Sequence, residues 1–171
     1  MEERPSAVTL KNNPLTLLGK EVKVGEKAPD FTAVEGLNNF ISLSTFKNKV
    51  KVFNVVISVD TPVCDVQTKR FNDESLTLPD DVEILTVSMD LPFAQTRYCK
   101  NTSIEKLRNI SDYMHASFGE SYGVLIKENR LLARAIFVVD KDDIVRHAEY
   151  VKEISEEPNY QAALDVVKSL I

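Results

Sequence analysis

The sequence predicts an α/β fold in which helices flank a central mixed sheet, with an added β-hairpin at the N-terminus. An apolar strand, a helix and a second apolar strand follow one another between residues 50 and 89, which is the order of a β-α-β unit. Two further apolar runs near the C-terminus flank a turn-rich spacer, which favours an antiparallel hairpin. With 171 residues, of which 43% are hydrophobic, the chain is expected to form a single domain spanning 1–171 with a full core.

The first predicted elements are strands. Two short apolar runs flank Asn12-Asn13-Pro14, and glycines punctuate the segment, so a β-hairpin is predicted over about residues 8–24. Residues 50–56 are rich in valine, and only a lysine and an asparagine interrupt them. Such a run is typical of a strand that is buried on both faces.

A helix is predicted to begin at Pro62, because proline is favoured at the first helical position and Thr61 is a good cap before it. A strand over residues 82–89 follows and is expected to pair in parallel with the first. The remaining predicted elements are, in chain order, a loop after Asp90 that holds Cys99, a partly irregular segment or short helix over residues 104–112, a hairpin of strands 132–139 and 144–151, and a final helix from about Pro158 to Ile171.

Cys64 is the first candidate for a reactive side chain. Counted from the Thr61 cap, it is the third helical residue, where the backbone N–H is free and the sulfur feels the positive end of the helix dipole. Both effects favour the thiolate over the thiol. Most free cysteines are simply small buried hydrophobes, so that interpretation stays open beside the reactive one.

Arg134 is the second candidate. It stands in a run, residues 131–139, whose two alternating faces are both apolar, so the strand is expected to be central and covered on both sides. A buried guanidinium needs an anionic or multiply hydrogen-bonded partner to offset its desolvation. The Cys64 thiolate could be that partner. An ordinary carboxylate could equally be the partner, or the side chain could reach the surface at the sheet edge.

Cys99 is the only other cysteine in the chain. Its distance from Cys64 in sequence rules out a C-x-x-C motif, and the lack of clustered partners argues against a structural zinc site. A static disulfide is expected mainly in secreted proteins, and nothing at the N-terminus resembles a secretory signal. Either a long-range bridge forms or none does; if one forms, we expect it to be transient and catalytic.

These residues lie within segments that closely resemble the thiol peroxidases, a branch of the peroxiredoxins that uses two cysteines within one chain. The resemblance covers essentially the whole length. Three ordered segments carry it: Asp60-Thr61-Pro62-Val63-Cys64, then Ser88-Met89-Asp90-Leu91-Pro92-Phe93-Ala94-Gln95 leading to Cys99, and Leu132-Ala133-Arg134-Ala135. The resemblance implies a thioredoxin-like fold, with Cys64 as peroxidatic cysteine, Cys99 as resolving cysteine, and Thr61 and Arg134 as the remaining catalytic residues.

The resemblance also implies a reaction cycle. The Cys64 thiolate attacks hydrogen peroxide or an organic hydroperoxide and becomes a sulfenic acid, which Cys99 converts to an intramolecular disulfide. Thioredoxin is the implied reductant of that disulfide. No metal or organic cofactor is needed, and a homodimer is expected from the family.

One residue departs from the family pattern. Peroxiredoxins usually carry a proline four residues before the catalytic threonine, and this chain has Ile57 there. Isoleucine lacks the ring and adds a backbone N–H that needs a partner, so reactivity could be reduced. Two alternatives to the peroxidase follow. One is a non-enzymatic thiol redox sensor or thioredoxin-like binding module with turnover blunted by Ile57; the other is a disulfide exchanger or metallochaperone, which is weakened because Thr61 occupies the position of the first C-x-x-C cysteine.

Charge and hydropathy argue against several other classes of protein. The formal net charge of -5 gives no basic patch, so nucleic acid is not an expected partner, and no apolar segment approaches the length of a membrane span. The acidic, polar N-terminus lacks the apolar stretch of a leader. We therefore expect a cytoplasmic protein.

Overall fold

The computed structural model describes residues 1–102, 104 and 106–171. Its strands are β1 (Glu3–Leu10), β2 (Asn13–Leu18), β3 (Ala33–Glu35), β4 (Asn39–Ile41), β5 (Val50–Val55), β6 (Val82–Ser88), β7 (Arg108–Ser111), β8 (Leu125–Ile126), β9 (Ala135–Val139) and β10 (Val145–Tyr150). Its helices are α1 (Pro62–Ser75), α2 (Pro92–Thr102), α3 (Ser117–Ser121), α4 (Tyr160–Ser169) and the 3₁₀-helix η1 (Leu43–Phe46).

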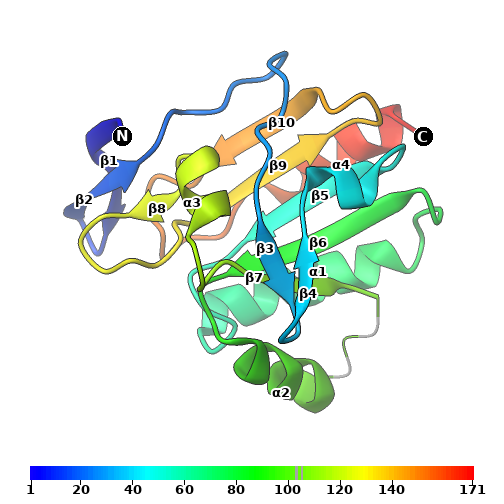
Figure 1. The fold of residues 1–171 in the computed structure, drawn as a ribbon, viewed down its shortest axis with the longest axis horizontal. Coiled ribbons are helices and arrows are strands. Elements are labelled where there is room, and N and C mark those ends of the chain that lie inside the picture. The colour runs from blue at the N-terminus through cyan, green and yellow to red at the C-terminus, as the bar shows by residue number, and fades with distance from the viewer. Residues whose placement is uncertain (103, 105) are drawn as a thin grey trace.

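A seven-stranded mixed sheet forms the centre of the fold, in the order β10-β9-β5-β6-β7-β3-β4 (Figure 1). The strands β5, β6 and β7 are parallel to one another, while β9 pairs antiparallel with β5 and β10 pairs antiparallel with β9. The predicted α/β fold with a central mixed sheet is therefore confirmed, and so is the parallel β5-α1-β6 unit.

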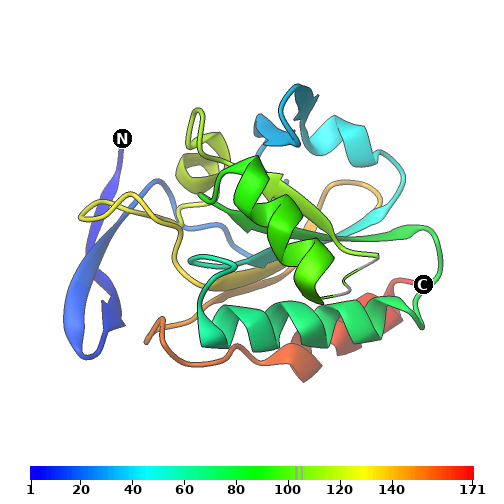
Figure 2. The ribbon, with the colours of Figure 1, turned by 90° about the horizontal axis from the view of Figure 1, so that it is seen from below.

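Both faces of β5 are buried, as its run of valines predicts. Val50 and Val52 belong to a core that α1, α2 and α4 complete from one side. Phe53 and Val55 point into the other core, which holds the stacked rings of Phe118 and Tyr122. Figure 2 shows α1 and α4 below the sheet and α3 and η1 above it. The helix that carries Cys64 thus packs directly against a fully buried strand.

The N-terminal hairpin is present, but it spans β1 and β2 rather than residues 8–24. Its turn uses Lys11 and Asn12, both with positive φ. The strands start earlier than predicted because the polar residues of β1 are held by tertiary contacts: Arg4 Nε donates to Gly19 O at 3.1 Å, and its Nη2 also donates to Gly123 O. β2 also pairs with β8, so the hairpin is part of a three-stranded sheet.

Two predictions between β6 and β9 are wrong. Cys99 lies on helix α2 and not in a loop, and the segment predicted as partly irregular or a short helix over residues 104–112 contains the strand β7. Residue 105 of that segment lies outside the described residues. Helix α2 has only a weak amphipathic pattern and β7 is four residues long, so neither produces a clear period in the sequence.

The C-terminal elements agree with the prediction within a few residues. β9 and β10 form the expected antiparallel hairpin, with a register shift between Val145 and His147. Helix α4 begins just after Pro158, and the side chain of Asn159 caps it by accepting a hydrogen bond from the Ala162 N–H at 3.1 Å.

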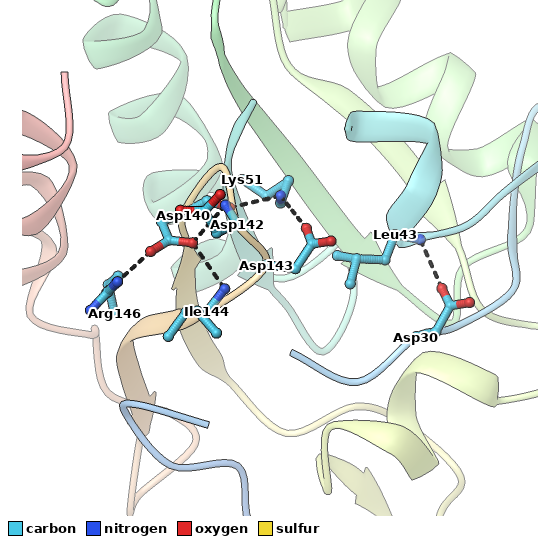
Figure 3. A network of polar contacts seen from close by, with 8 residues as sticks. All are labelled: Asp30, Leu43, Lys51, Asp140, Asp142, Asp143, Ile144 and Arg146. Carbon is cyan, nitrogen blue, oxygen red and sulfur yellow. Dashed lines mark hydrogen bonds and ion pairs between the residues drawn. The ribbon is translucent and has the colours of Figure 1, made fainter. Parts of the chain in front are cut away.

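A buried lysine donates hydrogen bonds to the turn between β9 and β10 (Figure 3). The Lys51 side chain is fully buried, and its Nζ donates to Asp140 O at 2.8 Å and to Asp143 Oδ1 at 2.6 Å. Asp140 Oδ1 in turn accepts from the backbone N–H groups of Asp142 and Ile144. The lysine that interrupts the valine run of β5 therefore finds its hydrogen-bond partners in the turn that follows the neighbouring strand β9.

The change Lys51→Met is expected to lower the free energy of unfolding by about 2 to 3 kcal/mol, because it removes two hydrogen bonds made by a fully buried charged donor, one to Asp140 O and one to the Asp143 carboxylate. Denaturant unfolding of the reduced protein measures this. Lys49→Met is the matched control, since Lys49 pairs with Glu83 near the surface and should cost less than about 1 kcal/mol. Equal losses for the two variants would contradict the structural role of Lys51.

Candidate active site

Cys64 lies where the sequence predicts it, in the first turn of α1. Thr61 is the N-cap, with extended φ and ψ of -101° and 145°, and Pro62 is the first helical residue. The Thr61 hydroxyl does not cap the helix through its oxygen; it donates to Ser58 O at 3.2 Å. The Cys64 side chain is fully buried. The thiol is therefore screened from water although it sits at the start of a helix.

Arg134 contacts Cys64 directly. Its Nη1 lies 3.3 Å from Cys64 Sγ and 2.6 Å from Gln67 Oε1, and its Nε donates to Ile154 O at 2.9 Å. The guanidinium is 1% exposed, so it does not reach the surface. Of the partners considered from the sequence, the Cys64 sulfur is the one that lies within hydrogen-bond distance. The sulfur and the buried guanidinium are therefore direct hydrogen-bond partners.

Gln67 is a site residue that the sequence reasoning missed. It lies one turn after Cys64 on α1, is fully buried, and joins Arg134 to the amide of Asn54 on β5. Asn54 Nδ2 donates onward to Thr86 Oγ1 at 3.0 Å. Residues three apart on a helix share a face, so a polar residue at this spacing from Cys64 was the available signal. The chain of amides fixes the orientation of the Arg134 guanidinium.

Asp90 holds the segment that leads into α1. Its two carboxylate oxygens accept from Ser58 Oγ at 2.7 Å and from the Val59 N–H at 2.9 Å. Asp90 follows β6, the parallel neighbour of β5, so the ends of the two strands bring it to this segment. The carboxylate therefore positions the turn that carries Thr61.

Cys99 is anchored separately from Cys64. Both cysteines are free thiols, and Cys99 is half-buried on α2. Asn109 Nδ2, from β7, lies 2.8 Å from Cys99 Sγ. Burial raises the pKa of the Cys99 thiol, and the hydrogen bond from Asn109 offsets part of that rise. Cys99 is therefore held mainly as a thiol near neutral pH in this conformation.

A groove runs along the first turn of α1. Its volume is about 420 Å³, and it is lined by Pro62, Val63, Val66, Ser155, Glu156 and Glu157. The groove is open to solvent beside the helix that carries Cys64, whereas the Cys64 side chain itself is covered. A small reactant can therefore approach the helix start, but it needs a local opening to reach the sulfur.

Comparison with known proteins decides the family. The redoxin family model matches residues 23–164. The chain is 52% identical to a thiol peroxidase of Oceanobacillus iheyensis, over 93% of this chain and 96% of that one, and 48% identical to a thiol peroxidase of Bacillus subtilis, over 96% and 98%. The chain belongs to the thiol peroxidase family. The resemblance inferred from the sequence motifs is confirmed, and this thiol peroxidase is an enzyme of the peroxiredoxin class.

Solved structures agree with this family. A peroxiredoxin-like protein from Aquifex aeolicus superimposes with a TM-score of 0.89 at 42% identity, covering 97% of this chain and 98% of that one. A thiol peroxidase from Chromobacterium violaceum, at 19% identity, shares the fold with a TM-score of 0.83, covering 95% of each chain. The predicted thioredoxin-like fold is therefore confirmed. No helix among the described residues is long and apolar enough to cross a bilayer.

Ile57, the residue that departs from the family motif, comes directly after β5 and Val56. Its side chain is half-buried against a small apolar cluster, which includes Leu17, Ile126 and Ile154. Among the described residues, none accepts a hydrogen bond from the Ile57 N–H. A proline at this position would therefore remove no hydrogen bond within the described chain.

The change Ile57→Pro is expected to raise the rate constant of Cys64 oxidation severalfold, because the ring fixes φ and removes an unpaired N–H beside the reactive segment. Stopped-flow measurement with an organic hydroperoxide gives that rate constant. Ile57→Val is the control, since it keeps the N–H and most of the apolar contact. A rate equal to or below that of the unchanged protein would refute the prediction.

Proposed function

We propose that Cys64 is the nucleophile of this thiol peroxidase and that Arg134 and Thr61 hold the hydroperoxide against it. The observation that carries this proposal is the 3.3 Å contact between Arg134 Nη1 and Cys64 Sγ inside a fully buried site. Hydrogen peroxide and organic hydroperoxides are the proposed substrates. The similarity to thiol peroxidases supports a peroxidase, and the buried thiol with its cationic partner supplies the chemistry.

In the first step, the Cys64 thiolate attacks one oxygen of the hydroperoxide, and the O–O bond breaks. Sulfur is oxidised to a sulfenic acid, and the other oxygen leaves as water or an alcohol after taking a proton. The Arg134 donors stabilise the negative charge that develops on the leaving oxygen. The Thr61 hydroxyl donates to Ser58 O, which leaves its lone pairs able to accept from the peroxide O–H.

In the second step, Cys99 attacks the sulfenic sulfur, water leaves, and an intramolecular disulfide forms between Cys64 and Cys99. A dithiol protein of the thioredoxin type then reduces this disulfide by thiol exchange. The presence of two free cysteines, each hydrogen-bonded by a different side chain, supports this assignment of two distinct roles.

We further propose that the enzyme works as a single-domain homodimer in the cytoplasm. Leu91 and Phe93, at the start of α2, are more than half exposed, and half of Val66 on α1 is exposed; such apolar surface favours association. A disulfide that must return to two thiols needs a reducing compartment, which the cytoplasm provides. Sedimentation at micromolar concentration tests the dimer, and a monomer alone would reject it.

The proposed cycle is tested by adding one equivalent of cumene hydroperoxide to the fully reduced protein, then counting free thiols and measuring the intact mass. We expect the loss of both thiols and of two hydrogens. In Cys99→Ser, we expect one oxidised cysteine and no disulfide. Survival of both thiols in the unchanged protein would reject the cycle and favour the non-enzymatic sensor or binding module.

A further inference from the structure

The residues next to the two cysteines are bonded to each other. Asp65 follows Cys64 on α1, and Tyr98 precedes Cys99 on α2. The Tyr98 hydroxyl donates to Asp65 Oδ1 at 2.7 Å, while Lys69 Nζ donates to the other carboxylate oxygen at 2.8 Å. The Tyr98 side chain is 8% exposed and belongs to the core that α1, α2 and α4 share. This hydrogen bond therefore joins the two helices that carry the thiols.

The two thiols are held by side chains from different strands in this conformation. Cys64 contacts Arg134, which immediately precedes β9, and Cys99 contacts Asn109 on β7. Strands β5 and β6 lie between β9 and β7, so the two anchors are separated by three strand spacings, or about 14 Å. A disulfide requires its two Cα atoms to lie within about 7 Å of each other. Because the two thiols are bonded to side chains from strands this far apart, we expect the disulfide to form only after α2, α1 or both leave their present positions.

Helix geometry places the tyrosine and the aspartate, rather than the cysteines, between α1 and α2. Consecutive helical residues point about 100° apart, so Asp65 faces α2 while Cys64 faces Arg134. In the same way, Tyr98 faces α1 while Cys99 faces Asn109. A movement that brings the sulfurs together must change the faces that the helices present, and it breaks the bond between Tyr98 and Asp65.

We propose that the Tyr98–Asp65 hydrogen bond is a latch that holds α2 against α1 while Cys64 reacts with peroxide, and that its release sets the rate at which Cys99 reaches the Cys64 sulfenic acid. Tyr98 and Asp65 are thus positioning residues for the second step and take no part in the first. The latch rests on the two-cysteine cycle proposed above.

The latch controls a competition between two fates of the sulfenic acid. Attack by the Cys99 thiol forms the disulfide and releases water. Attack on a second hydroperoxide instead gives a sulfinic acid at Cys64 and releases water or an alcohol, which inactivates the enzyme. The longer α2 stays docked, the larger is the fraction of the sulfenic acid that a second hydroperoxide oxidises to sulfinic acid. The strength of the latch therefore sets the peroxide concentration that the enzyme survives.

The change Tyr98→Phe tests the latch, because it keeps the buried ring and removes only the hydroxyl. We expect disulfide formation to accelerate about tenfold, since a hydrogen bond to an ionised group is lost from the docked form alone. The rate of sulfenic acid formation should stay unchanged. The reduction potential of the disulfide should fall by about 30 mV, which is that tenfold change expressed for a two-electron couple.

Three comparisons separate the latch from a general effect on stability. Tyr160→Phe is the matched control, because Tyr160 donates to Glu157 Oε1 at 3.0 Å and packs on Phe71, yet it does not link α1 to α2. Asp65→Ala should accelerate the second step as Tyr98→Phe does, and the double variant should be no faster than either single one. Tyr98→Phe should lower the melting temperature of the reduced protein and leave that of the disulfide form unchanged.

The outcomes are distinguishable. If the unchanged protein forms the disulfide but Tyr98→Phe and Asp65→Ala form it at the same rate or more slowly, the latch is wrong and the two-cysteine cycle stands. If the unchanged protein forms no disulfide with cumene hydroperoxide, the cycle itself is wrong and the latch is overturned with it. If Tyr98→Phe does not fold, Asp65→Ala, which keeps the core intact, decides between these outcomes.

Discussion

The change Cys64→Ser is expected to abolish hydroperoxide reduction while leaving the fold intact. Serine is close to cysteine in size, and its hydroxyl can still accept from Arg134 Nη1, so the buried guanidinium keeps a partner. The hydroxyl is not ionised near neutral pH and has no adjacent base to activate it, so the nucleophile is lost. Hydroperoxide consumption with thioredoxin as reductant measures the effect.

Cys99→Ser is the control for this prediction. Its Cys64 is unchanged, so it should complete one oxidation per chain and then stop, because the disulfide cannot form. Denaturant unfolding of both reduced variants checks that neither has lost its fold. Hydroperoxide turnover by folded Cys64→Ser above the uncatalysed rate would show that another group carries the reaction.

The reactive segment could be predicted from the sequence because each of its signals is local. The valine run of β5, the Pro62 start and the Thr61 cap lie within a dozen residues, and the structure places α1 where they predict. The apolar run around Arg134 likewise predicts a buried guanidinium. Local patterns of this kind report burial and element type directly.

The contacts that complete the site could not be predicted in the same way. Asp90 reaches Ser58 across the ends of two neighbouring strands, and Asn109 on β7 reaches Cys99 on α2, so these pairs depend on how strands and helices are arranged rather than on sequence spacing. The bond from Tyr98 to Asp65 depends on how two helices rotate against each other. The sequence predicts a loop in place of helix α2 because only a few residues of that helix are buried.

Hydrogen bonds through Gln67 and Arg134 connect the central strand β5 to the Cys64 sulfur. Asn54 interrupts the valine run of β5 on the face that α1 covers, and there it meets Gln67, which in turn holds the guanidinium. Asn54 is thus part of a chain of hydrogen bonds that runs from Thr86 to the Cys64 sulfur. A site built on a central strand and the first turns of a helix is held more precisely than one on loops.

The change Arg134→Lys is expected to lower the rate constant of Cys64 oxidation by about 10²- to 10³-fold, the usual cost of removing one donor that stabilises developing charge. Lysine keeps the positive charge but lacks the planar fork that donates to Cys64 Sγ, Gln67 Oε1 and Ile154 O together. Stopped-flow oxidation by cumene hydroperoxide measures the rate constant, at a temperature where denaturant unfolding shows the reduced variant to be folded.

Arg146→Lys is the matched control for this change. Arg146 lies on β10, is partly exposed, and donates to Asp140 Oδ2 at 2.6 Å without contact to Cys64. Its replacement should leave the rate of Cys64 oxidation unchanged. If Arg134→Lys is folded and reacts within about threefold of the unchanged protein, then charge alone suffices and the geometry of the guanidinium has no catalytic role. A loss confined to Arg134→Lys assigns that role to the fork held by Gln67 and Ile154.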